Sequence, residues 1–257
     1  MYRRIFARKS FFRFNRILHS LSLHGLGMLN PENDRVSGER SFLIRHLRGT
    51  GPCVVFDVGA NEGAYARQVR GIRPEAQVYS FEPHPKTFQL LKRNAEEHGF
   101  LAFNVACGSA PVRGKLYDYA HRDGSVHASM YREVIEHLHA GTPVEHAVDV
   151  ITLDDFAAEH HVSVVDLLKI DVEGNELDVV KGFLRSIEAH RVKAIQFEFN
   201  DMNVSSRVFF KDFYDLLPAF EFHRMLPGAL IPLGEYNALA CEIFAYQNIV
   251  ALPRAMR

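Results

Sequence analysis

The sequence predicts an α/β protein built around a mostly parallel β-sheet, and three observations support this fold class. Residues 54–106 alternate between strand-like and helix-like patterns in the order β-α-β-α-β, which requires parallel strands joined by right-handed crossovers. The run 164–171 is apolar almost throughout, as in a central strand that is buried on both faces. Gly59 and Gly63 allow a sharp turn from the first strand into a helix.

Composition and charge describe an ordinary globular protein. Of the 257 residues, 47% are hydrophobic and 24% are charged, which is enough apolar material for a sizeable core. The net charge of −1 gives no whole-surface attraction to nucleic acid or to membranes. Three scattered cysteines without a CxxC spacing favour a reducing compartment over disulfides or a zinc site. We therefore expect a cytoplasmic protein.

The first thirty residues differ from the remainder of the chain. Between Tyr2 and Arg16 there are five arginines, one lysine, four phenylalanines and no acidic residue. Charged residues interrupt the apolar positions, so no run of about 18 apolar residues exists that could span a membrane. We expect residues 1–30 to form an arm that packs on a domain comprising residues 31–257. The alternative is that this basic amphipathic arm makes a peripheral contact with a membrane.

The expected elements follow from apolar periodicity and from turn residues. Gly, Pro and Asn between the apolar segments mark where each element ends. In the first half of the chain the predicted elements are helix 39–47, strand 54–57, helix 63–70, strand 77–82, helix 86–98 and strand 100–106.

The second half begins less regularly. The connection 120–146 is rich in His, Ser and Gly, with a short helix expected at 131–140, and its length is typical of a functional loop. Four short apolar segments close the chain and predict a β-hairpin ending. The predicted elements are strands 114–119 and 148–153, helix 153–160, strand 164–171, helix 176–184, strand 192–199, helix 209–217 and the segments 220–225, 229–233, 241–246 and 249–252.

The first strand and its turn suit two classes of nucleoside ligand. A dinucleotide site requires G-x-G-x-x-G, whereas this chain has Asn61 at the middle glycine position. Asp57 stands two residues before Gly59, where it would repel a pyrophosphate but attract an ammonium or sulfonium centre. Glu82 ends the second strand and can accept ribose hydroxyls in either class. The pattern favours S-adenosylmethionine, and NAD is the alternative.

Several longer motifs make this indication specific. The segments Phe56–Gly63, Phe81–Pro83 and Leu168–Glu176, together with Thr152–Asp155, resemble the FkbM family of S-adenosylmethionine-dependent methyltransferases. The resemblance covers roughly residues 39–252. It implies the class I, Rossmann-like methyltransferase fold, with a seven-stranded, mostly parallel sheet and a C-terminal antiparallel hairpin. It also implies O-methylation, because the family mostly methylates hydroxyl oxygens on sugars, glycolipids, exopolysaccharides or polyketides.

Acidic residues end several of the predicted strands. Asp57, Glu82, Asp171 and Glu198 all fall at carboxyl ends, which a parallel sheet gathers at one edge. Methyl transfer to a hydroxyl needs an aligned acceptor and removal of its proton. Asp171 or Glu173 could accept that proton, or could orient the acceptor or the methionine ammonium group, and the sequence does not separate these roles.

The remaining site residues complete the prediction. Ala106 and Cys107 follow the third strand and are expected at the adenine. Glu176, His127 and Glu198 are expected at the acceptor. Oxygen ligands for a metal are available, but no firm ligand spacing supports one, so we expect none. The predicted cofactor-binding residues are Asp57, Gly59, Asn61, Gly63, Glu82, Ala106, Cys107 and Asp171.

The preferred function is therefore S-adenosylmethionine-dependent O-methylation of a saccharide, a glycolipid or a secondary metabolite. An NAD-dependent oxidoreductase and a non-catalytic, methyltransferase-like binding protein are the alternatives. Nucleic acid is not an expected partner, because the chain is nearly neutral and contains no tryptophan for stacking on bases. The expected acceptor is a small-molecule or saccharide hydroxyl.

Overall fold

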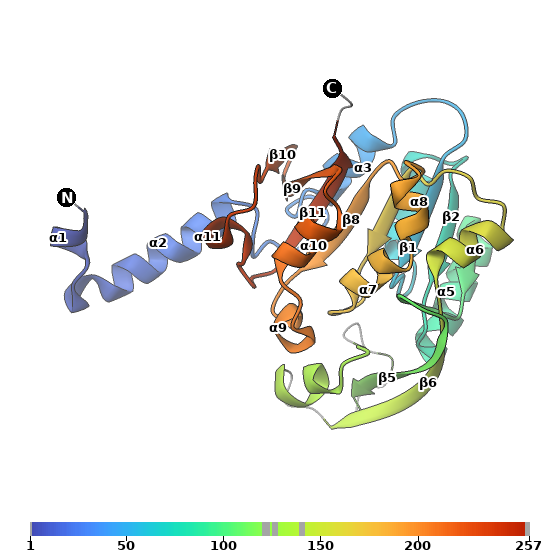
Figure 1. Ribbon diagram of the computed structural model, residues 1–257, viewed down its shortest axis with the longest axis horizontal. Helices are drawn as coiled ribbons and strands as arrows, with labels where there is room; N and C mark the ends of the chain where they lie inside the picture. The colour runs from blue at the N-terminus through green and yellow to red at the C-terminus, as the bar shows by residue number, and fades with distance from the viewer. Residues whose placement is uncertain (1, 120–123, 125–127, 139–141, 255–257) are drawn as a thin grey trace.

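In the residues that the computed structural model describes (2–119, 124, 128–138 and 142–254), eight strands form a central sheet in the order β10-β9-β11-β8-β7-β1-β2-β3. Helices lie on both faces of this sheet (Figure 1). The strands are β1 (Val54–Val58), β2 (Gln77–Phe81), β3 (Leu101–Phe103), β7 (Leu167–Ile170), β8 (Ile195–Phe199), β9 (Phe220–Leu226), β10 (Ala229–Pro232) and β11 (Gln247–Pro253).

The pairing of these strands confirms the predicted fold class. Strands β3, β2, β1, β7 and β8 pair in parallel, and β11 lies antiparallel between β8 and β9. The sheet has eight strands among the described residues rather than the seven expected. The extra one is β10, which turns back tightly on β9 at Gly228 (φ +83°) and pairs Ala229 with Leu226.

One segment of the predicted C-terminal hairpin is not a strand. Of residues 241–246, Cys241 ends the short helix α11 (Ala238–Cys241), which Asn237 caps by accepting from two backbone N–H groups, and 242–246 follow it. The carboxylate of Glu242 then accepts the backbone N–H groups of Phe210 and Lys211 at 2.9 Å each. Glu242 therefore caps the neighbouring helix α10 (Phe210–Leu216), and this segment does not pair in the sheet.

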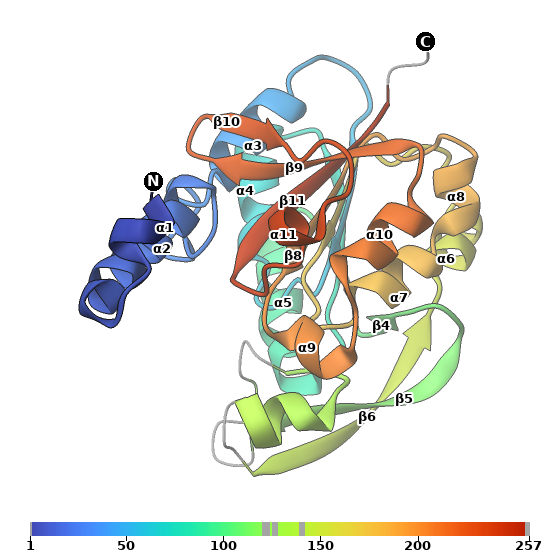
Figure 2. The ribbon, with the colours of Figure 1, turned by 60° about the vertical axis from the view of Figure 1, so that its left-hand side comes forward.

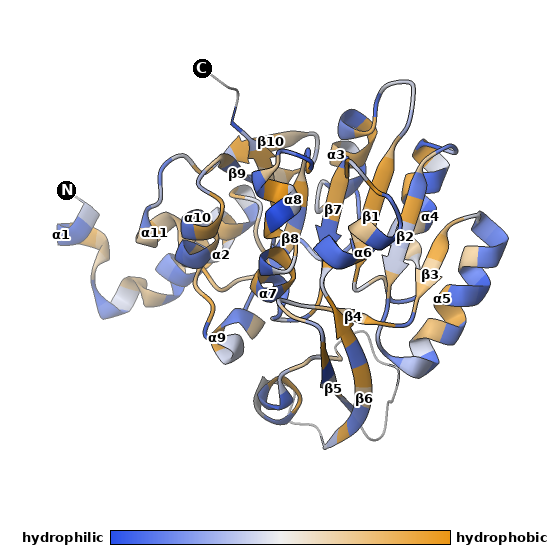
Figure 3. Cartoon of the chain, turned by 45° about the vertical axis from the view of Figure 1, so that its right-hand side comes forward, coloured by the Kyte–Doolittle hydropathy of each residue, from blue (hydrophilic) through white to orange (hydrophobic). Residues whose placement is uncertain are grey.

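Two apolar cores lie on the two faces of the sheet. Val55 points into one core, whereas its neighbour Phe56 points into the other, as the alternation of a strand requires. Figure 3 shows apolar strands covered by helices whose outer surfaces are hydrophilic. The first face is covered by α3 (Glu39–His46), α4 (Ala64–Ile72) and α5 (Pro85–His98), and the second by α6 (Leu153–Glu159), α7 (Glu176–Lys181), α8 (Leu184–Glu188) and α10.

The predicted strand 100–106 is divided between two sheets. After β3, the side chain of Asn104 donates to the carbonyl oxygens of Glu82 and Pro83, and the chain leaves the large sheet. A second, three-stranded sheet lies below the carboxyl edge of the large sheet (Figures 1 and 2). It comprises β4 (Ala106–Cys107), β5 (Val112–Tyr119) and β6 (Pro143–Ile151), in the order β4-β6-β5.

Two predicted helices also differ from the structure. The helix expected at 176–184 is interrupted between α7 and α8 at Gly182, where an added Cβ would lie 2.0 Å from the carbonyl oxygen of Gly108. The helix expected at 131–140 contains a π-helical turn at Val134–Leu138.

The strand expected at 148–153 is β6, which begins five residues earlier, at Pro143, and takes in the end of the predicted connection 120–146. The short helix α9 (Met202–Ser206) was not predicted. The other predicted elements begin and end within about three residues of the predicted positions.

The N-terminal arm consists of α1 (Tyr2–Phe6), a 3₁₀ turn η1 (Lys9–Phe11) and α2 (Phe12–Gly25). These helices extend away from the body of the molecule (Figures 1 and 2). The expectation that the arm packs on its own domain holds only at its base, because Leu23 is the one buried residue of the fully described α2. Among the described helices, none has the length and apolarity required to cross a membrane.

Candidate active site

A pocket of about 610 Å³ opens at the carboxyl ends of β1, β2, β7 and β8. Open parallel sheets commonly bind ligands at this edge, and the volume suits a small molecule. Among the described residues, the wall contains several carboxylates and one ammonium group, a balance that favours a cationic ligand. These charged residues are Glu39, Asp57, Glu82, Lys169, Asp171, Glu173, Glu198 and Asp201.

The turn after β1 forms one wall of the pocket. Gly59 has φ +77° and Asn61 has φ +49°, so both adopt left-handed backbone conformations. A Cβ added to Gly59 would lie 1.7 Å from the carbonyl oxygen of Asp171, where the chain leaves β7. Glycine is therefore required for the close approach of the two loops. Gly63 begins α4 behind this turn, packed against Phe100 and Leu91, and does not line the pocket.

Glu82 joins the end of β2 to the same turn. Its Oε2 accepts the backbone N–H of Asn61 at 3.0 Å, and its Oε1 accepts that of His84 at 2.8 Å. Burial raises the pKa of Glu82 to about 7, although the two N–H donors act in the opposite direction. Each carboxylate oxygen has a second lone pair, so Glu82 can also accept hydroxyl groups from a ligand in the pocket.

Asp57 is the most deeply buried acid of the wall, with 0% of its surface exposed. Neither of its carboxylate oxygens meets a donor at full hydrogen-bond geometry in the described part of the chain, although the backbone N–H of Ala66 acts to lower its pKa. Burial raises the pKa of Asp57 to about 6, and the positive charge of Lys169 opposes this shift. Because buried carboxylates are normally satisfied, this side chain is suited to meet a positively charged ligand.

Lys169 lies directly opposite Asp57 in the β1–β7 pairing. Its Nζ donates to Oδ2 of Asp171 at 2.8 Å and lies 5.4 Å from the centre of the Tyr65 ring. Burial disfavours the charged ammonium group, but Asp171, Asp57 and Glu39 outweigh burial and raise the pKa of Lys169. The side chain is therefore a fixed positive charge that neutralises part of the acidic wall.

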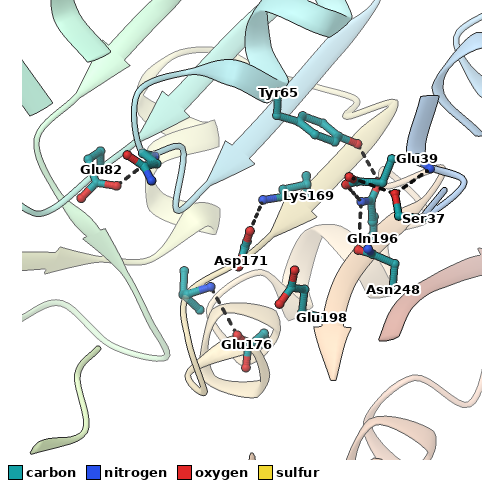
Figure 4. Close-up of polar contacts among 12 residues, drawn as sticks. Ser37, Glu39, Tyr65, Glu82, Lys169, Asp171, Glu176, Gln196, Glu198 and Asn248 are labelled. Atoms are coloured by element: carbon teal, nitrogen blue, oxygen red, sulfur yellow. Dashed lines mark hydrogen bonds and ion pairs between the residues drawn. The ribbon is translucent and has the colours of Figure 1, made fainter. Parts of the chain in front are cut away.

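A second chain of polar side chains reaches the pocket from α3, and no sequence motif pointed to it. Oε1 of Glu39 accepts from Nε2 of Gln196 at 2.6 Å, and Oε1 of Gln196 accepts from the Tyr65 hydroxyl at 2.7 Å (Figure 4). Burial raises the pKa of Glu39. Helix α3 precedes every recognisable motif, so only tertiary contacts could identify Glu39 as part of this wall.

Three carboxylates converge at the ends of β7 and β8. Asp171, Glu173 and Glu198 each offer one oxygen, and these oxygens lie within 4.8 Å of one another. Figure 4 shows Asp171 and Glu198 extending from their strands into the same space. Burial and the neighbouring acids raise the pKa of both Glu173 and Glu198 well above that of an ordinary glutamate.

Carboxylates this close to one another favour taking up a proton or a cation. Their oxygens are the ligands that a hard cation such as Mg²⁺ prefers. The expectation that no metal binds stays a prediction.

Glu176 fixes the loop that carries this cluster. Its Oε1 accepts the backbone N–H groups of Val172 at 3.3 Å and Gly174 at 3.0 Å. Glu173 and Gly174 both have positive φ, at +56° and +105°. Glu176 does not line the pocket, so the structure places it behind the acidic loop, where its bonds present Glu173.

The second sheet supplies an apolar wall opposite the acids. Ala106 and Cys107 of β4 line it together with Leu116 of β5 and the nearby Met130. The hydroxyl of Ser129 donates to the carbonyl oxygen of Glu173 at 2.7 Å, which ties this wall to the acidic loop. The pocket thus has an apolar side suited to a flat ring and an acidic side suited to polar groups.

Most of the predicted site residues are brought together at this pocket. His127 lies outside the described residues, and Gly63 and Glu176 stand behind the wall. What each residue binds stays a prediction. The predicted residues that line the pocket are Asp57, Gly59, Asn61, Glu82, Ala106, Cys107, Asp171, Glu173 and Glu198.

Comparison with known proteins agrees with this geometry. The profile of the Methyltransferase FkbM domain matches residues 57–226, which begin at Asp57 near the end of β1 and include β2, β7, β8 and both acidic loops.

Three named relatives are similar to this chain. The 2-O-methyltransferase NoeI of Sinorhizobium fredii is 26% identical over 189 residues, covering 68% of this chain and 74% of the relative. The 31-O-demethyl-FK506 methyltransferase FkbM of Streptomyces tacrolimicus is 28% identical over 202 residues, which cover 65% of this chain and 77% of the relative. The hexuronic acid methyltransferase AglP of Haloferax volcanii is 26% identical over 136 residues, which cover 53% of this chain and 52% of the relative.

Proposed function

This chain belongs to the FkbM family of methyltransferases, and we propose that it methylates a hydroxyl oxygen of a saccharide, a glycolipid or a secondary metabolite. The family and the class I fold imply the use of S-adenosylmethionine. When bound, this cofactor supplies an electrophilic methyl group on a sulfonium sulfur. The observation that carries the proposal is the fully buried Asp57, whose oxygens meet no donor at full hydrogen-bond geometry among the described residues and which faces an acidic pocket.

The β1 turn and the end of β2 form the cofactor side in this proposal. Asp57 balances the positive charge of the cofactor, and Glu82 accepts its ribose hydroxyls. Gly59 lets the β1 turn lie against the β7 loop, because a larger residue would displace that loop, and so the two sides of the pocket meet there. Ala106 and Cys107 border the adenine from the second sheet.

The acidic loops after β7 and β8 form the acceptor side. Lys169 holds Asp171 in place, so we assign Asp171 to orientation of the acceptor and of the methionine end. The pKa is raised for both Glu173 and Glu198. We assign Glu173 as the base for the acceptor hydroxyl, because Glu176 and Ser129 fix the loop that carries it. Glu198 lies beside it and adds a second polar contact for the acceptor.

The acceptor class follows from the chemistry of the relatives. NoeI is a 2-O-methyltransferase, AglP methylates a hexuronic acid, and FkbM acts on 31-O-demethyl-FK506. A hydroxyl group on a saccharide or small molecule is the feature that we carry over to this chain. The alternatives, an NAD-dependent oxidoreductase and a non-catalytic binding protein, receive no support from the family match.

The proposal also names the cellular compartment of the protein. Three buried, unpaired cysteines suit a reducing compartment, so we place the protein in the cytoplasm. A peripheral membrane contact through the basic arm of residues 1–30 belongs to the same proposal.

Cofactor binding tests the proposal directly. Calorimetry of the purified protein should detect S-adenosylmethionine, and Asp57→Ala and Glu82→Ala should each lose most of that affinity. Glu221→Ala removes an exposed acid far from the pocket and serves as the control. Equal affinity in all of these variants and the unmodified protein would contradict the proposed site. A parallel titration with NADH tests the dinucleotide alternative.

A further inference from the structure

The helix α2 exposes an apolar stripe along one face, and Phe14 at its start also packs against the rings of Phe6 and Phe11 within the arm. Phe14, Ile17, Leu18 and Leu21 recur at helical spacing, which places them on one face. Their exposed fractions are 45%, 59%, 39% and 62%. A stripe with this spacing normally faces a protein core, yet this helix extends away from the body (Figures 1 and 2).

The same arm is strongly basic. No acidic residue occurs before Glu32, so the arm carries only positive side-chain charges from its lysine and arginines. An exposed apolar stripe on a cationic helix is the combination that binds in the interface of anionic lipid bilayers. The same charges oppose pairing of two arms from separate copies of the chain. The basic residues are Arg3, Arg4, Arg8, Lys9, Arg13 and Arg16.

The base of the arm is fixed to the body. Gly27 has φ +84°, and an added Cβ would lie 2.4 Å from the carbonyl oxygen of Met225 in β9. Met28 is fully buried and forms an antiparallel bridge with Gln247. These contacts make the base of α2 a part of the sheet edge.

This base is also continuous with the pocket wall. The backbone N–H of Leu29 donates to the carbonyl oxygen of Tyr246 at 2.8 Å. Tyr246 lines the pocket, and so does Pro31, which lies two residues after Leu29 in the chain. A surface that holds the arm therefore lies next to the rim of the pocket.

We propose that α2 docks on an anionic phospholipid bilayer through its apolar stripe and the basic residues of the arm, and that the acceptor hydroxyl belongs to a lipid-linked molecule in that bilayer. The docking surface stands independently of the chemistry. The acceptor class rests on the proposed function, because it assumes that the pocket transfers methyl groups.

Vesicle flotation of the full-length chain tests the docking surface. The protein should float with vesicles of equal phosphatidylglycerol and phosphatidylcholine, but not with phosphatidylcholine alone, and salt of about 0.5 M should weaken the binding. The double variants Ile17→Ser with Leu21→Ser, and Arg13→Glu with Arg16→Glu, should each reduce binding about tenfold or more. Val112→Ser is the matched control, because Val112 is 59% exposed on β5.

Three outcomes would overturn the docking surface. Equal binding to both vesicle types would remove the role of lipid charge, and full binding by both double variants would remove the role of the arm. A dimer in sedimentation velocity that Ile17→Ser with Leu21→Ser dissociates would identify a second copy as the occupant. Circular dichroism melting should show that the exposed substitutions leave the body folded.

A labelling experiment tests the acceptor class. Full-length protein, methyl-labelled S-adenosylmethionine and a total membrane extract from the source cells should yield label in the organic phase. Absence of label from that phase would overturn the lipid-linked acceptor, including the case where only water-soluble saccharides are labelled. Calorimetric affinity for the cofactor is measured on the same sample, and its absence would instead contradict the proposed function.

Discussion

The Nζ atom of Lys169 lies 2.8 Å from Oδ2 of Asp171, and this ion pair stands in a pocket wall whose other described charges are carboxylates. The lysine side chain is 8% exposed, so water screens the pair only weakly. Asp57 and Glu39 also raise the pKa of this lysine. Lys169 therefore compensates several buried negative charges at once.

Removing the positive charge of Lys169 should destabilise the folded protein. We expect Lys169→Met to lower the free energy of unfolding by about 3–5 kcal/mol, because it leaves buried carboxylates without their cation. Lys193→Met is the control, since Lys193 pairs with Asp166 at 2.6 Å on a 58% exposed side chain and should cost less than about 1 kcal/mol. Urea denaturation measures both, and similar losses would refute a special role for Lys169.

The turn after β1 should not tolerate a side chain at Gly59. Gly59→Ala must displace the Asp171 carbonyl and adopt a strained φ of +77°, so we expect a loss above about 3 kcal/mol and failure to bind the cofactor. Gly71→Ala, in the helix α4 with open space around it, should instead stabilise the protein by about 0.5–1 kcal/mol. Thermal melts compare the two, and a mild effect at Gly59 would disprove the tight approach.

Burial of Glu82 predicts a pH dependence of stability. Its pKa rises from 4.5 to about 7 on folding, so between these values the folded state holds a proton that the unfolded state has released. The stability of the ligand-free protein should therefore fall as the pH rises through this window. Between pH 5.5 and pH 8 this fall amounts to about 2 kcal/mol, and Glu82→Gln should remove it. Urea melts at pH 5.5 and pH 8 check the sign, and an unchanged slope in Glu82→Gln would exclude this carboxyl group as a source.

Loss of the base should affect turnover more than binding. We expect Glu173→Gln to lower kcat about 10²- to 10⁴-fold, while calorimetric affinity for S-adenosylmethionine changes less than about threefold. Asp201→Asn, at an exposed position of the same pocket, should retain most activity. If the two variants lose activity equally, the acidity of the pocket as a whole matters and Glu173 is not the base.

Local patterns explain the correctly predicted part of the site. The strand, glycine turn and helix at 54–70 are specified by neighbouring residues, and the β-α-β order makes the strands parallel. A parallel sheet places all of its carboxyl ends at one edge, so Asp57, Glu82, Asp171 and Glu198 could be assigned to one pocket before any contact was known.

Two predicted strands differ from the structure because side chains bind backbone groups at turns and helix ends. The strand expected at 241–246 is absent because Asn237 and Glu242 direct their oxygens to backbone N–H groups of helices. The third strand was divided because Asn104 holds the chain at the Glu82 carbonyl. Apolar periodicity carries no information about such side-chain acceptors.

Local pattern and strand order were enough to predict the fold class and the acids at the strand ends, whereas the cofactor class was indicated by those acids together with the family resemblance. Three features are visible only in the folded chain: Glu39 joins the wall, Lys169 pairs with Asp171, and α2 exposes its apolar stripe. These features depend on which distant surfaces meet when helices and strands pack, and a single sequence records no such distances.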